Sequence, residues 1–107
     1  MFDLFKKESV PSIHVNDMDP LLGSVDLIDI RESYEFNTGS LKTAKNIPMG
    51  ILLNEPDKYL KKDKNYYILC QSGARSGNAS RMLVKQGYRV VNVSGGMGSY
   101  AGTKRTS

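Results

Sequence analysis

The fold is decided by residues 66–88, which read YYILCQSGARSGNASRMLVKQGY. The first four residues are aromatic and aliphatic, as in a strand buried on both faces of a sheet. They lead directly into Cys70, the one cysteine of the chain. Small, hydroxyl-bearing and turn-forming residues follow it, and the remainder has the pattern of a helix. We therefore predict a strand, a loop and a helix in succession, with Cys70 at the carboxyl end of the strand.

The helix is predicted to run from about residue 75 to residue 86. Its buried face is indicated by apolar residues at i, i+3 and i+4, namely Ala79, Met82 and Leu83. Gly87 can take the left-handed conformation that ends a helix, and Tyr88 then falls where a hydrophobic contact back to Leu83 is expected.

Similar short apolar runs occur at residues 25–30 and 89–93, with weaker strand candidates at 12–15 and 44–47. Shorter helices are predicted after Asn16, after Arg31 and around residues 49–53. Strands that alternate with helices indicate an α/β domain with a mainly parallel sheet. Ligands of such sheets bind at the carboxyl ends of the strands, and Cys70 lies at one of those ends.

The composition is that of a small globular domain. The chain has 107 residues, of which 39% are hydrophobic and 24% charged, and this suits one domain with one core. We predict an N-terminal segment at residues 1–11, the domain at 12–102 and a flexible C-terminal tail at 103–107. No stretch approaches the ~20 apolar residues that span a bilayer, and residues 1–7 lack the apolar centre of a secretory signal.

Charge and cysteine usage narrow the class of partners. The net charge is +4, and its densest cluster, at residues 58–64, is interrupted by acids and has no aromatic stacking pattern. We interpret it as a solvated surface and expect no nucleic-acid partner. One cysteine cannot form an internal disulfide, so a reducing, cytoplasmic location is expected. His14 lies far from Cys70 in the sequence, and no ligand-spaced pair indicates a metal.

The loop of residues 70–76 has the residue types of an anion cradle. Gly73 permits a turn with positive φ, and small side chains leave the backbone N–H groups open at the start of a helix. A sulfur held there is stabilised as thiolate, the nucleophilic form. Arg75 adds a positive charge, and Ser72 and Ser76 add hydroxyl donors. The plainer alternatives are a cysteine that only fills the core and an arginine that makes a surface ion pair.

Two chemistries use a nucleophilic cysteine in an anion cradle, and spacing separates them. Cysteine-based phosphatases place cysteine and arginine as C-x5-R, whereas Cys70 and Arg75 are spaced as C-x4-R. The shorter loop has less room for a phosphate and suits a smaller centre, such as the outer sulfur of a persulfide. The residue before the cysteine is Leu69, where a phosphatase commonly has histidine. Sulfur transfer is therefore favoured.

At this point the sequence resembles the single-domain rhodaneses, over roughly residues 12–101. The loop CQSGARS at 70–76 is similar to their C-x-x-G-x-R-S active-site loop. LIDIRESYEF at 27–36 resembles their hD-h-R-E-x-x-E-F segment, and AKNIP at 44–48 their A-x-N-I-P segment. GYRVVNVSGGM at 87–97 resembles their closing segment. Departures occur at Ser40 and Leu41, where many members have His-Ile, and at Tyr100, where many have Trp.

This resemblance implies a three-layer fold, with a five-stranded, mainly parallel sheet and helices on both faces. It implies a sulfurtransferase of the thiosulfate sulfurtransferase type, in which Cys70 is catalytic and carries sulfur as a persulfide. The pocket would be lined by the loop residues that bind the substrate, Gln71, Ser72, Gly73, Ala74, Arg75 and Ser76. Asp29 and Arg31 would have structural roles, tying a strand end to neighbouring loops. The departures would affect packing or the polarity of the pocket rim rather than sulfur chemistry.

The expected reaction is a double displacement. Cys70 takes a sulfane sulfur from thiosulfate, a persulfide or a polysulfide and passes it to cyanide or a thiol, which a partner protein can carry. No cofactor or metal is needed. The alternatives that stay open are a non-enzymatic binding module of the same fold, a redox-sensing thiol without a resolving cysteine, and a phosphatase or arsenate-type reductase.

Overall fold

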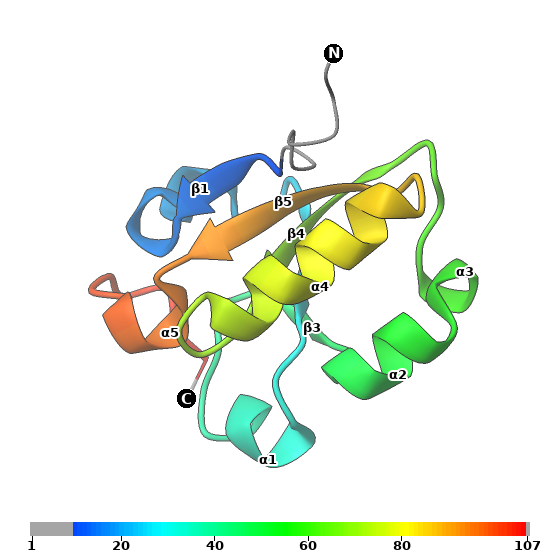
Figure 1. Ribbon diagram of the computed structural model, residues 1–107. Coiled ribbons are helices and arrows are strands. Elements are labelled where there is room, and N and C mark those ends of the chain that lie inside the picture. The colour runs from blue at the N-terminus through cyan, green and yellow to red at the C-terminus, as the bar shows by residue number, and fades with distance from the viewer. Residues whose placement is uncertain (1–9, 107) are drawn as a thin grey trace.

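The structure is a computed structural model, and it describes residues 10–106. Its sheet has five strands in the order β1-β5-β4-β2-β3. Every strand pairing is parallel (Figure 1). The strands are β1 (Ser12–His14), β2 (Asp26–Asp29), β3 (Lys45–Asn46), β4 (Asn65–Leu69) and β5 (Arg89–Ser94). The predicted five-stranded parallel sheet is confirmed, including the two weaker strand candidates.

Helical segments connect these strands. Two 3-10 turns follow β1, η2 (Val15–Asp17) and η3 (Asp19–Leu21), and the α-helices are α1 (Ser33–Phe36), α2 (Met49–Asn54), α3 (Pro56–Tyr59), α4 (Ala74–Lys85) and α5 (Gly96–Ser99). The helices expected after residues 16 and 31 and around 49–53 are present. The sequence did not predict α3 or α5, which are each four residues long.

The core lies on both faces of the sheet because successive strand residues point to opposite sides. In β4, Ile68 belongs to the cluster that packs under α2 and α4, whereas Leu69 belongs to the cluster on the opposite face. That second cluster includes Val15 of η2 and Met97 of α5. Helix α4 runs across the first face (Figure 1). The result is the three-layer arrangement expected of a parallel sheet.

The end of α4 agrees with the prediction, but part of its buried face does not. Gly87 has φ +96°. Its N–H donates to the carbonyl of Val84, and the N–H of Tyr88 donates to that of Leu83, both at 3.0 Å, so the helix ends in a Schellman motif. Leu83 is fully buried, but Met82 is 46% exposed, so its assignment to the core was wrong. At about 100° per residue, position 82 turns away from the face that the buried residues share.

The described C-terminal residues pack on the domain. The N–H of Thr106 donates to the carbonyl of Ser40, and the N–H of Lys42 donates to that of Lys104, both at 2.8 Å. The contacts of this segment with the domain thus continue beyond the predicted boundary at residue 102. They are backbone hydrogen bonds, which the polar composition of the tail gives no means to predict. Most of the predicted N-terminal segment, residues 1–9, lies outside the described residues.

Within residues 10–106, no helix is long and apolar enough to cross a membrane.

Candidate active site

Cys70 directly follows β4, which lies in the middle of the sheet between β5 and β2. Its side chain is fully buried, and the backbone then turns into α4 through Gly73, which has φ +93°. A residue with a Cβ is strained in that conformation, so the turn predicted at this glycine is confirmed. The strand end and the helix start are thereby brought to the same sulfur atom.

The sulfur of Cys70 is surrounded by hydrogen-bonding groups of its own loop. The N–H of Gly73 donates to Sγ at 3.0 Å, and the N–H of Ser76 donates to it at 3.4 Å. The Cys70 thiol in turn donates to Oγ of Ser76 at 3.3 Å, and that hydroxyl donates to the carbonyl of Gly73 at 3.2 Å. Two backbone amides and one hydroxyl therefore face the sulfur.

These groups change the acidity of the thiol. Burial by itself raises the pKa of Cys70, because it disfavours the charged thiolate. Hydrogen bonds from the side chain and backbone of Ser76 and from the backbone of Gly73 and Ser72 outweigh burial, so the pKa is lowered. The loop thus stabilises the nucleophilic form of a cysteine that is buried.

The turn at the start of α5 keeps the loop carbonyls away from the sulfur. The N–H of Met97 donates to the carbonyl of Cys70 at 2.9 Å, and the N–H of Gly98 donates to that of Gln71 at 2.8 Å. A Cβ at Gly96 would lie 2.5 Å from the same carbonyls, so only glycine fits there. With these carbonyls held towards α5, the amide side of the following peptides is free to face Sγ. The sequence shows Gly96 next to Gly95, but it did not reveal that Gly96 lets α5 pack against the cysteine loop.

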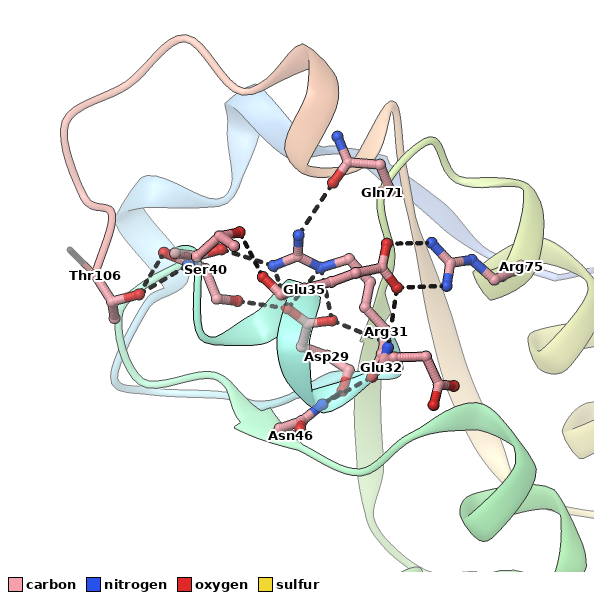
Figure 2. A network of polar contacts seen from close by, with 11 residues as sticks. Asp29, Arg31, Glu32, Glu35, Ser40, Asn46, Gln71, Arg75 and Thr106 are labelled. Atoms are coloured by element: carbon pink, nitrogen blue, oxygen red, sulfur yellow. Dashed lines mark hydrogen bonds and ion pairs between the residues drawn. The ribbon is translucent and has the colours of Figure 1, made fainter.

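A buried ion pair at the end of β2 contacts the cysteine loop. The guanidinium of Arg31 contacts both carboxylate oxygens of Asp29, at 2.9 to 3.1 Å, and both residues are almost inaccessible. Arg31 also donates to Oε1 of Gln71 at 3.0 Å and to the carbonyl of Gly39 at 2.7 Å (Figure 2). These contacts connect the end of β2 to the residue after Cys70. They are the kind of contacts that the structural roles inferred for Asp29 and Arg31 require.

The two departures from the resemblance make polar contacts away from the sulfur. Ser40 is fully buried and donates from Oγ to Asp29 at 2.7 Å. The hydroxyl of Tyr100 donates to Asp19 at 2.7 Å and accepts from the N–H of Lys104. Neither side chain has a hydrogen bond to Cys70 among the described residues.

Arg75 has no hydrogen bond to the sulfur among the described residues. Its guanidinium forms a two-pronged ion pair with Glu35 of α1, at 2.8 and 2.9 Å (Figure 2). Arg75 is 39% exposed, and Glu35 is 20% exposed. The arginine lowers the pKa of Glu35 to about 2, and the carboxylate raises the pKa of Arg75. The expectation that Arg75 contributes a free positive charge is therefore wrong, and the plainer alternative, an ion pair, is correct. Glu35 was not recognised as part of the site.

The other loop residues lie at the surface. Gln71, Ser72 and Ala74 are exposed, and Oγ of Ser72 accepts from the N–H of Ala74 at 3.4 Å. A cleft of about 410 Å³ opens elsewhere, between α3 and strands β2 to β4. It is lined mainly by lysine, tyrosine and aliphatic residues and includes none of the residues 70–76. Because Cys70 does not line that cleft, we assign the chemistry to the cysteine loop.

Comparisons with known proteins agree on the family. The family model described as "Rhodanese-like domain" matches residues 15–103. A Bacillus subtilis protein named "Putative sulfurtransferase YtwF" is 44% identical over 78 residues, which cover 71% of this chain and 73% of that protein. An Allochromatium vinosum protein named "Sulfurtransferase" is 38% identical over 76 residues and covers 70% of each chain.

A solved structure shows the same fold. The rhodanese-like domain protein from Staphylococcus aureus superimposes with a TM-score of 0.80 at 29% identity, covering 91% of this chain and 97% of that one. The segment that the family model matches includes strands β2 to β5 and the cysteine loop. The named relatives support sulfurtransferase activity at the level of the family. The protein therefore belongs to the rhodanese-like domain family.

Proposed function

We propose that this protein is a sulfurtransferase that carries sulfur as a persulfide on Cys70. The observation that carries the proposal is the pair of backbone amides, of Gly73 and Ser76, that donate to Sγ, beside the Ser76 hydroxyl that accepts from the thiol. Donors fixed in place before reaction stabilise negative sulfur without any cost of reorganisation. A cysteine retained only for packing would need no such donors.

The first half of the reaction loads the cysteine. The Cys70 thiolate attacks the sulfane sulfur of the donor, an S–S bond forms, and the bond between that sulfur and the rest of the donor breaks. With thiosulfate the departing group is sulfite, which leaves with the bonding electron pair. The products are the Cys70 persulfide and sulfite, and no net oxidation occurs.

The second half of the reaction unloads the sulfur from Cys70. A thiolate or cyanide attacks the outer sulfur, and Cys70 leaves as thiolate, stabilised by the same amides of Gly73 and Ser76. The acceptor becomes a persulfide or thiocyanate. A relative named "Putative sulfur carrier protein YrkF" is 34% identical, although the matched part covers only 43% of that protein. That name supports a thiol acceptor in general, which a partner protein can carry. We also propose a location in the reducing cytoplasm, because the chain has a single cysteine.

Access to the sulfur requires a movement of the loop. Cys70 has no exposed surface, whereas Gln71 and Ser72, which follow it, are exposed. We infer that the donor enters when residues 71–75 shift outward, and that the closed loop then shields the persulfide from water.

The arrangement does not favour phosphate chemistry. A phosphatase needs its loop arginine to bind the phosphate beside the nucleophile, but both terminal nitrogens of Arg75 are bound to Glu35. Together with the C-x4-R spacing, this supports sulfur over phosphorus as the substrate centre.

The proposal is tested by turnover. Thiocyanate formation from thiosulfate and cyanide is measured for the wild type and for Cys70→Ser, with hydrolysis of an aryl phosphate measured in parallel. We expect thiocyanate only from the wild type and no phosphatase activity above the Cys70→Ser control. Thiocyanate formation that is equal in both proteins, or Cys70-dependent hydrolysis of the phosphate, would overturn the proposal.

A further inference from the structure

The ion pair between Arg75 and Glu35 sets the charge at the edge of the cysteine loop. Arg75 is the sixth residue of the loop 70–76, and its guanidinium lies between the loop and α1. Oε1 of Glu35 accepts from Arg75 and also from the N–H of Glu32, at 3.0 Å, while Oε2 accepts the second nitrogen of Arg75. Glu35 is thus held in place by α1 as well as by the arginine.

A second arginine beside the loop is also paired with a carboxylate. Arg31 is the second guanidinium in this network, and its charge is matched by the buried carboxylate of Asp29. Arg75 of the loop and Arg31 beside it are thus each paired with a carboxylate, whereas the groups that donate to the sulfur are backbone amides. Amides stabilise a sulfur anion at short range, but they attract a distant dianion much less than a free guanidinium does.

We propose that Glu35 is a specificity-determining residue that neutralises Arg75 and thereby disfavours dianionic sulfur donors relative to monoanionic ones. This inference rests on the proposed sulfurtransferase function and names the donor class that the same site prefers. The favoured donors are persulfides and other donors with a single negative charge. Thiosulfate, with two charges, remains a substrate, but an inefficient one.

Two donors that differ in charge but react alike make the inference testable. Thiosulfate gives its outer sulfur to the Cys70 thiolate and releases sulfite. Methanethiosulfonate, a monoanion, gives its outer sulfur in the same way and releases methanesulfinate. In both reactions one S–S bond forms, one S–S bond breaks, and the leaving group keeps the electron pair. In a double displacement, kcat/KM for the donor reports only this loading step.

The variant is Glu35→Gln, which keeps the size of the side chain and removes its charge. One amide oxygen can still accept from Arg75, but the amide nitrogen then faces the other guanidinium nitrogen, so the two-pronged contact is lost. The matched control is Glu55→Gln, the same substitution at an exposed residue between α2 and α3 that has no side-chain hydrogen bond among the described residues.

We expect Glu35→Gln to raise kcat/KM for thiosulfate roughly 3- to 10-fold, since a partly screened charge acts on two donor charges. For methanethiosulfonate the factor should be about the square root of that, because only one charge is involved. Both gains should shrink as ionic strength rises, and Glu55→Gln should show neither. In an Arg75→Ala background, Glu35→Gln should still raise kcat/KM for thiosulfate more than kcat/KM for methanethiosulfonate, because the substitution then removes a negative charge that has lost its arginine.

The inference is overturned if Glu35→Gln changes both donors by the same factor, or lowers kcat/KM for thiosulfate more than for the monoanion. An equal change would mean that Glu35 only holds α1 against the loop. Failure of the proposed function looks different, because then neither donor would place sulfur on Cys70 in any variant.

Discussion

The hydroxyl of Ser76 should account for a measurable part of the acidity of Cys70. In the neutral site the thiol donates to Oγ of Ser76 at 3.3 Å, and the hydroxyl donates to the carbonyl of Gly73 at 3.2 Å. When the thiol ionises it has no proton to donate, and the hydroxyl can turn its own proton from Gly73 to the sulfur. Ser76→Ala removes this exchange but leaves both backbone N–H contacts with Sγ in place.

The size of the effect follows from the hydrogen bonds exchanged on ionisation. One hydrogen bond to a charged group, about 1.5–3 kcal/mol, replaces two neutral ones of about 0.5–1.5 kcal/mol each, so the net stabilisation of the thiolate is at most about 2 kcal/mol. Ser76→Ala should therefore raise the pKa of Cys70. The remaining amides should keep it below that of a cysteine that is buried without donors.

The assay is the rate of alkylation by iodoacetamide as a function of pH. The midpoint of the profile is the readout, because a thiolate of higher pKa is also more nucleophilic and this blurs the rate at a single pH. Ser80→Ala is the matched control, since Ser80 is fully buried in the same helix and its hydroxyl has no hydrogen-bond partner within residues 10–106. A midpoint that is the same in Ser76→Ala, Ser80→Ala and the wild type would refute the reasoning.

Further substitutions test the supports of the loop. Gly96→Ala should destabilise the protein by at least about 2 kcal/mol in urea unfolding, because its Cβ would lie 2.5 Å from the carbonyl of Cys70 and its φ is +63°; unchanged stability would mean that the turn of α5 is not tightly packed on the loop. Asp29→Asn should cost about 3–5 kcal/mol in the same measurement, since it leaves the buried Arg31 without its counter-charge; a loss below about 1 kcal/mol would show that the pair is dispensable. The pKa of Glu35 is lowered from 4.5 to about 2, so its contribution to stability is complete above about pH 4.5 and is lost as the pH falls towards 2. Glu35→Gln should therefore weaken the pH dependence of unfolding in that window, and an identical acid profile would contradict this.

Patterns close together in the sequence predicted most of the fold. The run before Cys70 is apolar on both faces, so it identified the central strand, and Gly87 marked the end of α4. Met82 was misplaced because the i, i+3 spacing from Ala79 is equally compatible with either side of the buried face. Helix α5 escaped prediction because its glycines have poor helix propensity, and its place is set by carbonyls of the cysteine loop.

The candidate site was predicted only where it is local. The loop amides and the turn at Gly73 follow from residue types near Cys70 in the sequence. The partner of Arg75 is Glu35, 40 positions away, and the partner of Gln71 is Arg31, at the same separation. An arginine in a chain with 11 acidic residues has many conceivable partners. Only the folded structure shows which of them lies within reach.

The central claim is that Cys70 carries sulfur, and the mass of the intact protein tests it most directly. The wild type and Cys70→Ser are incubated with thiosulfate or a polysulfide, separated from the donor and weighed by mass spectrometry, then treated with cyanide and weighed again. The wild type should gain the mass of one sulfur atom and lose it to cyanide, whereas Cys70→Ser should gain none. A wild type that gains no sulfur from any of these donors, or a Cys70→Ser variant that gains the same mass, would contradict the account.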